Sequence, residues 1–131
     1  IFERAIKCLE SSLDICEKDK ADILRFVEHL LAKGVSKAKA VKYIYHLIVL
    51  ARVTDKPFES LGRRDVERLV SWINASDYSE NTKRDYKIVL KKFFQWLRGC
   101  SEEDYKYPHP EDLSSPVRQK LTNFTLTLFS F

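Results

Sequence analysis

Basic side chains recur along one side of the segment between Tyr78 and Gly99. At 100° per residue, the polar residues that form a stripe beside the apolar side of a helix are Arg84, Lys87, Lys91, Gln95 and Arg98. A row of ammonium and guanidinium groups offers one kind of chemistry, which is the electrostatic binding of a polyanion. The alternative is a solvated helix surface, which is the commoner role of a single basic stripe.

A second basic segment lies earlier in the chain. Residues 36–56 carry five basic side chains and one acid, and residues 80–99 carry six basic side chains and two acids, so each segment has a net charge of +4. Because the whole chain also carries +4, all other residues together carry −4. This concentration of one sign favours a docking surface, since a surface that serves solubility usually mixes signs. The polar side chains in the first turns of the earlier segment are Lys39, Lys42, Tyr43 and His46.

The surrounding sequence predicts an all-α chain, because only three Gly and four Pro interrupt it. A short first helix is expected, with Phe2, Ile6, Leu9 and Leu13 on its apolar side and an end between residues 11 and 18. A second helix is expected within residues 19–34, closed by Gly34. These two predicted helices must position the basic segment of residues 36–56, which follows them in the chain.

The remaining helices have recognisable ends. Ser36 is the expected N-cap of a third helix, whose "YIYHLIVLA" is apolar nearly all round, as is typical of a central helix. Pro57 is expected to open one helical turn. A fourth helix is expected from Arg63, and a fifth between the N-cap Ser79 and Gly99. If the third and fifth helices pack side by side, their basic sides form one surface suited to DNA phosphates.

The sequence gives no support for a disulfide-rich, a zinc-binding or a membrane-spanning protein. The three cysteines form no C-x-x-C pair, so neither a disulfide framework nor a zinc site is predicted, and a reducing, cytoplasmic location is expected. No apolar run is long enough to span a membrane. Residues 100–131 change in character, from the acidic, proline-broken "CSEEDYKYPHPEDLSSP" to the strand-like "LTNFTLTLFSF". We therefore expect a helical binding domain over residues 1–99 and an irregular linker or tail over residues 100–131.

The sequence of the last predicted helix resembles a motif of a known protein family. "SENTKRDYKIVLKKFFQWL" follows the S-x-N-T-x-x-x-Y-x-x-x-L-x-x-F-F-x-W-L run of the N-terminal core-binding domain of tyrosine recombinases, or phage-type integrases. The resemblance extends over residues 18–99, and within the family the sequence resembles archaeal integrases. It implies a SAM-like orthogonal bundle of four to five helices that clamps double-stranded DNA at a recombination site.

The resemblance also implies which residues face DNA. By position, the DNA-binding candidates are Ser36, Lys37, Lys39, Lys42, Tyr43, His46, Asn81, Thr82, Lys83, Arg84, Lys87 and Lys91. His46 is equally well explained as a packed surface residue. The family cleaves DNA with a tyrosine nucleophile in a separate catalytic domain, which uses a His-x-x-Arg pair that this sequence lacks. The chain is therefore expected to bind DNA without catalysis, and without a metal or cofactor.

A rival interpretation comes from another class of protein. Ile88, expected on the exposed side of the last helix, and the apolar tail are also compatible with a helical module for protein–protein interaction, which joins recombinase protomers or another partner. A small-molecule substrate has no support, because no phosphate-cradling glycine loop and no nucleophile–base pair is found. The DNA target sequence, the organism, the oligomeric state on DNA and the role of the first helix do not follow from the sequence.

Overall fold

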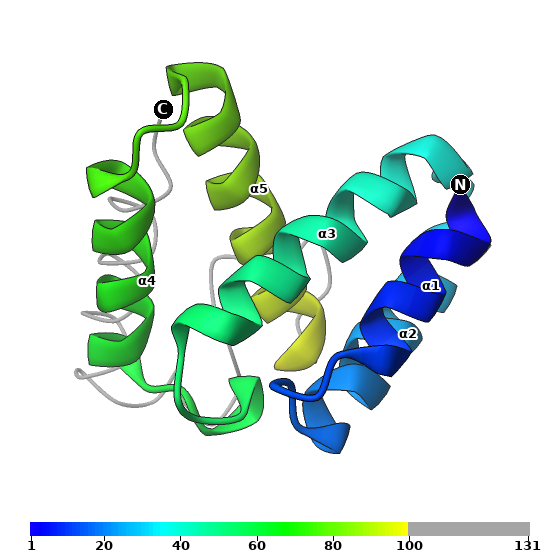
Figure 1. Cartoon of the computed structure of the whole chain (residues 1–131), viewed down its shortest axis with the longest axis horizontal. Helices are drawn as coiled ribbons and strands as arrows, with labels where there is room; N and C mark the ends of the chain where they lie inside the picture. The colour runs from blue at the N-terminus through cyan, green and yellow to red at the C-terminus, as the bar shows by residue number, and fades with distance from the viewer. Residues whose placement is uncertain (100–131) are drawn as a thin grey trace. The chain divides into compact units, whose positions relative to one another are not determined.

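The computed structural model describes residues 1–99, which form five α-helices and one turn of 3₁₀ helix (Figure 1). The elements are α1 (Phe2–Ser11), α2 (Glu17–Ala32), α3 (Lys37–Val53), η1 (Phe58–Ser60), α4 (Arg63–Ala75) and α5 (Glu80–Leu97). The prediction of an all-α chain with four to five helices is confirmed for this part of the chain. The strand predicted near the C-terminus lies outside the described residues.

The chain divides into two compact units. The first comprises residues 1–61 and contains α1, α2, α3 and η1; the second begins at Gly62 and contains α4 and α5.

Local chemistry sets the helix ends at the predicted places. Ser36 caps α3 by accepting a hydrogen bond from the backbone N–H of Lys39, and Ser79 caps α5 in the same way through Thr82. Gly34 and Gly99 follow α2 and α5 with φ of 91° and 76°, a region in which a side chain would be strained. Pro57 precedes the 3₁₀ turn rather than forming its first residue.

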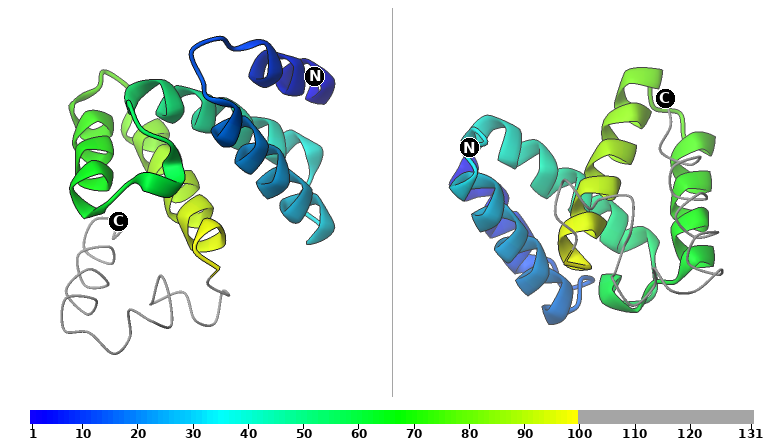
Figure 2. Two further views of the ribbon diagram at one scale, coloured as in Figure 1. Left: turned by 90° about the horizontal axis from the view of Figure 1, so that it is seen from below. Right: turned by 180° about the vertical axis from the view of Figure 1, so that it is seen from behind.

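In the first unit, α1 and α2 both pack against α3 (Figure 2). Its core contains fully buried apolar side chains from all three helices and from η1: Ala5, Leu9, Ile23, Ile44, Leu47, Leu50 and Phe58. Helix α3 contributes more buried side chains to this core than α1 does, and α1 and α2 both pack on it, which agrees with its predicted central position within the unit, although one stripe that includes Lys42 and Tyr45 stays exposed. The apolar contacts of α1 and α2 therefore decide which residues of α3 are left for the surface.

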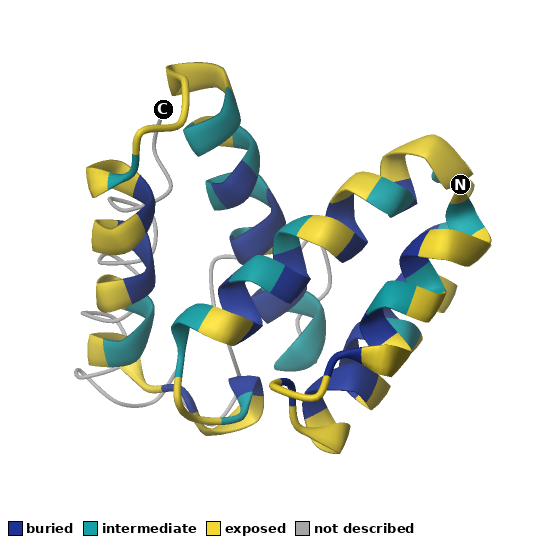
Figure 3. Ribbon diagram, in the orientation of Figure 1, coloured by how far each residue is buried: buried dark blue, intermediate teal, exposed yellow. Residues whose placement is uncertain are grey.

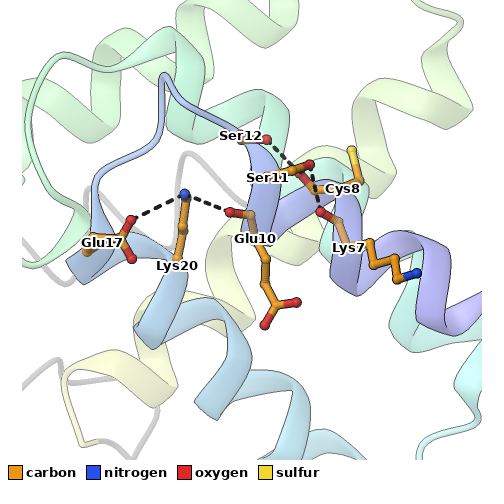
Figure 4. A network of polar contacts seen from close by, with 7 residues as sticks. All are labelled: Lys7, Cys8, Glu10, Ser11, Ser12, Glu17 and Lys20. Carbon is orange, nitrogen blue, oxygen red and sulfur yellow. Dashed lines mark hydrogen bonds and ion pairs between the residues drawn. The ribbon is translucent and has the colours of Figure 1, made fainter.

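Leu13 departs from the prediction, because it is fully exposed and lies beyond the end of α1. The hydroxyls of Ser11 and Ser12 bond back to the carbonyls of Lys7 and Cys8, and Ser12 has an extended backbone conformation (Figure 4). Such side-chain bonds compete with the continuation of a helix. Ile15, which is 4% exposed, enters the core in place of Leu13.

Buried polar side chains connect α2 to its neighbours. The ammonium of Lys20 donates to the carbonyl of Glu10 at the end of α1, at 3.0 Å, and contacts the Glu17 carboxylate at 3.4 Å (Figure 4). The Asp19 carboxylate, 3% exposed, accepts a 2.8 Å hydrogen bond from the backbone N–H of Phe58. These bonds fasten α1 and η1 to the first turn of α2 within one unit.

In the part of the second unit that the structure describes, α4 and α5 run in opposite directions side by side (Figure 1). Leu69, Val70 and Ile73 form the buried side of α4, while the opposite side is exposed (Figure 3). On α5 the buried residues are Tyr86, Val89, Leu90, Phe93 and Phe94. The apolar stripe predicted for the last helix is therefore its packed side, and its basic residues are left on other sides.

Candidate nucleic-acid interface

The first turn of α3 presents polar groups to solvent. Ser36, Lys37 and Lys39 are all exposed. The first helical hydrogen bond runs from the backbone N–H of Ala40 to the carbonyl of Ser36, so the amides of the first turn point out of the helix end. Free N–H groups and the positive end of the helix dipole both favour a negatively charged oxygen at such a position. Three predicted residues thus lie together at one helix end.

One stripe of α3 continues this exposure into the middle of the helix. Lys42 is exposed, and Tyr45, one turn further on, is 37% exposed. Tyr45 is not among the predicted DNA contacts, because the surrounding "YIYHLIVLA" indicated burial all round. A signal was nevertheless present, since Tyr45 stands three residues after Lys42 and therefore shares its side of the helix. We refer to Ser36, Lys37, Lys39, Lys42 and Tyr45 as the α3 patch.

Tyr43, one of the predicted DNA contacts, does not belong to this patch because its side chain is buried. Its side chain is 3% exposed and packs edge-on against Phe26 of α2, with ring centroids 5.9 Å apart. Tyr43 lies on the side of α3 that α2 covers, whereas Lys42 is turned by 100° toward solvent. His46 is half-buried, between these two situations.

The start of α5 carries the next predicted residues. Asn81 is exposed and Thr82 is half-buried. The Ser79 hydroxyl lies 3.0 Å from the Thr82 hydroxyl and accepts the Thr82 backbone N–H at 3.2 Å. Thr82 therefore stabilises the cap, and Asn81 is the residue of this pair with an accessible side chain.

Lys83 has a structural partner in the described chain. Its ammonium donates to the carbonyl of Asn74 at 3.0 Å and lies 3.5 Å from the Glu80 carboxylate, and its side chain is only 14% exposed. A carbonyl in the last turn of a helix lacks an intrahelical donor, and Lys83 supplies one to α4. Lys83 therefore has an acidic neighbour one turn before it, in addition to its carbonyl partner.

The predicted basic stripe of α5 remains accessible. Arg84 is exposed, and the other members are half-buried: Lys87, Lys91, Gln95 and Arg98. The guanidinium of Arg98 lies 5.1 Å from the centroid of the Phe94 ring, an arrangement in which a cation is attracted to the face of an aromatic ring. We refer to these five residues as the α5 stripe. None of them is buried.

An aromatic cluster lies beside the start of α5. Tyr78 and Tyr86 stack with ring centroids 5.1 Å apart, and Trp72 contacts both rings edge-on at 6.2 and 6.5 Å. Trp72 is 36% exposed, so part of the cluster lies at the surface. Burial and the adjacent Tyr78 hydroxyl raise the pKa of Tyr86 above its ordinary value. The cluster holds the turn between α4 and α5.

Two further observations concern residues 1–99. No cluster of three or more His, Cys, Asp or Glu side chains in this range is arranged to hold a metal ion. None of its helices combines the length and the apolar character that crossing a bilayer requires.

The comparisons with known proteins identify the family. The model of the phage integrase N-terminal SAM-like domain matches residues 23–99, which is more than half of the 131-residue chain. No curated protein and no solved structure matched the chain. The matched range contains α3, α4, α5 and most of α2, so it covers both basic segments. The chain belongs to the phage integrase N-terminal SAM-like domain family and is thus a recombinase-associated helical domain.

Proposed function

We propose that this chain is the core-binding domain of a site-specific tyrosine recombinase and that it binds double-stranded DNA through the α3 patch and the α5 stripe. Membership of the integrase family supports the link to recombination. The observation that carries DNA contact is the α5 stripe, in which four cations follow one another on an unburied side of a helix. Each cation that meets a phosphate releases condensed counterions, which is a sequence-independent source of affinity.

The α3 patch contributes contacts of a different kind. Its exposed lysines surround a helix N-terminus, where backbone amides favour a phosphate oxygen. Lys42 and Tyr45 lie further along the helix and supply a cation and a phenol hydroxyl on the same side. Contacts of this kind position a protein on the DNA backbone, whereas base edges carry the sequence information. We therefore expect modest sequence preference from this domain.

The proposal assigns binding without cleavage to this chain. Residues 1–99 form the binding module, and residues 100–131 lead toward a catalytic domain that acts elsewhere in the recombinase. None of the six tyrosines is assigned as a nucleophile, because no His-x-x-Arg pair accompanies them. A cytoplasmic location is expected from the cysteine pattern, and other recombinase protomers are the expected protein partners.

Fluorescence anisotropy of a labelled duplex of about 30 base pairs, titrated at several salt concentrations, tests the proposal. With roughly five to eight phosphates neutralised, the slope of log K against log salt is expected to lie between about −4 and −7. Alanine at Lys39, Arg84 and Lys87 together should weaken binding and make the slope shallower by about three. Lys83 is left unchanged, because its ammonium is bonded to α4.

A charge-matched control separates specific contacts from net charge. Alanine at Arg4, Lys7 and Arg64 removes three exposed cations from α1 and α4, outside both proposed surfaces. If the control variant loses as much affinity as the test variant, the two surfaces are not the interface. If the unmodified chain fails to bind DNA even at low salt, the DNA-binding proposal is wrong. A mass that rises with protein concentration, without DNA, would then favour the protein–protein module.

A further inference from the structure

Helix α1 lies outside the residues that match the family, yet it is an integral part of the first unit. The family match begins at residue 23, whereas α1 ends at Ser11. Ala5 and Leu9 of α1 have no exposed surface, and α1 packs against both α2 and α3. Residues before the matched range therefore help to form the core on which α3 rests.

The contacts of α1 reach the DNA-facing end of α3. The ammonium of Lys37 lies 5.5 Å from the centroid of the Phe2 ring, in a cation–π contact. Lys37 is the first residue of α3 and a member of the α3 patch, and it is exposed. Phe2 is the first residue of α1 and is half-buried. An otherwise freely rotating lysine is thus held beside the helix N-terminus by a ring from another helix.

The opposite end of α3 is tied to the segment that follows α1. The Nε atom of Arg52 lies 2.9 Å from the Asp14 carboxylate, and its Nη2 donates to the Ser12 hydroxyl at 3.2 Å. Ser12 in turn donates to the Cys8 carbonyl at 2.7 Å. The residues from α1 to Asp14 therefore hold α3 near both of its ends. Arg52, although it adds to the positive charge of the segment, is engaged in this attachment.

We propose that α1 is a positioning element for DNA binding, in which the Phe2 ring holds the Lys37 ammonium where a phosphate meets the N-terminus of α3. This inference rests on the proposed function, and it adds a segment that the family match does not include. Residues 1–13 carry two acidic and two basic side chains, Glu3, Arg4, Lys7 and Glu10, so their side chains contribute no net charge. The contribution of α1 to affinity is therefore positional rather than electrostatic.

A double-mutant cycle between Phe2 and Lys37, in the full chain, tests the inference. Phe2→Leu keeps an apolar side chain but removes the aromatic face, and Phe2→Trp keeps the face. From the usual strength of an exposed cation–π contact, Phe2→Leu should weaken binding about two- to fivefold, while Phe2→Trp should bind like the unmodified chain. In the Lys37→Ala background, Phe2→Leu should have no further effect. Thermal unfolding monitored by circular dichroism accompanies each variant.

The outcomes distinguish this inference from the proposed function. Failure of the unmodified chain to bind the duplex overturns the DNA proposal itself. Normal binding by the unmodified chain and by Phe2→Leu overturns only the positioning role. The same holds if Phe2→Leu weakens binding equally with and without Lys37, because the loss would then come from the fold of the unit and not from the ammonium group. An effect that disappears in the Lys37→Ala background supports the proposal.

Discussion

Replacement of Asp19 by alanine should destabilise the first unit more than any surface substitution. The Asp19 carboxylate is 3% exposed and accepts a 2.8 Å hydrogen bond from the backbone N–H of Phe58, a residue with no exposed surface. Alanine leaves this N–H without its acceptor in a buried place. A buried donor that loses its partner costs about 1–3 kcal/mol, and hydrogen bonds to charged groups lie toward the upper part of that range. We therefore expect a loss of about 2 kcal/mol.

The burial of the Asp19 carboxylate opposes its ionisation. The loss of unfolding free energy in Asp19→Ala is therefore smaller than the hydrogen bond alone would give, and it depends on pH. Burial raises the pKa of Asp19 above its ordinary value of 3.8, against the opposing hydrogen bond from Phe58. The folded chain therefore binds a proton more readily than the unfolded chain between pH 3.8 and the folded-state pKa. Across that window, ionisation of Asp19 lowers stability as the pH rises. Relative to Asp19→Asn, which does not titrate, the unmodified chain should gain stability as the pH falls through the window.

Urea and thermal unfolding, followed by circular dichroism, measure the effect. A loss of about 2 kcal/mol corresponds to a fall in Tm of roughly 8–16 °C for a domain of this size. Asp19→Asn keeps an oxygen acceptor for the Phe58 N–H and should cost less than about 1 kcal/mol. Asp77→Ala is the control, because Asp77 is exposed, and it should stay within about 0.5 kcal/mol. The reasoning is refuted if Asp19→Ala is as stable as the control, or if the amide is as costly as alanine.

Four further predictions concern α3 and α5. Because burial and a neighbouring hydroxyl raise the pKa of Tyr86, it should ionise above the ordinary tyrosine pKa of about 10 in an ultraviolet titration, and the stability that this proton confers should be lost as the pH rises above about 10; an unchanged high-pH part of the titration curve in Tyr86→Phe would contradict this. Lys83→Ala should lower the free energy of unfolding by about 1 kcal/mol through the lost carbonyl bond, and a melting temperature equal to that of the unmodified chain would be the contrary result. Arg84→Ala should make the salt slope of DNA binding shallower by about one, and an unchanged slope would contradict its place in the interface. Tyr43→Phe should leave DNA affinity unchanged in the anisotropy assay, because its side chain is buried; a severalfold loss without unfolding would return Tyr43 to the interface.

The residues that end helices act locally, and they were therefore predictable. Ser36 and Ser79 bond to amides three residues ahead, and Gly34 and Gly99 adopt left-handed backbone conformations. Neither effect depends on a distant part of the chain. The resemblance of the last helix to the family motif was recognisable for a different reason, because a sequence motif is defined by the order of the residues alone.

The side of α5 that carries the basic stripe also followed from the sequence. Its broad apolar side, which includes Leu90 and Phe93, must be buried, and helical geometry then leaves the residues from Arg84 to Arg98 on another side. In α3, by contrast, the apolar residues surround the helix, so periodicity alone could not show where solvent reaches it. For this reason the sequence did not show that Tyr45 is exposed or that Tyr43 is buried.

What only the tertiary structure decided is which partner each polar side chain has. Tyr43 is buried because Phe26 of α2 lies against it, and Lys83 is engaged because the end of α4 offers it a carbonyl. Arg52 is held by Asp14, which is distant in the sequence. The spacing of residues within a helix determines which of them share a side, because this depends on one backbone. Whether that side meets solvent or another element depends on contacts between segments far apart in the chain, and a periodic pattern carries no information about them.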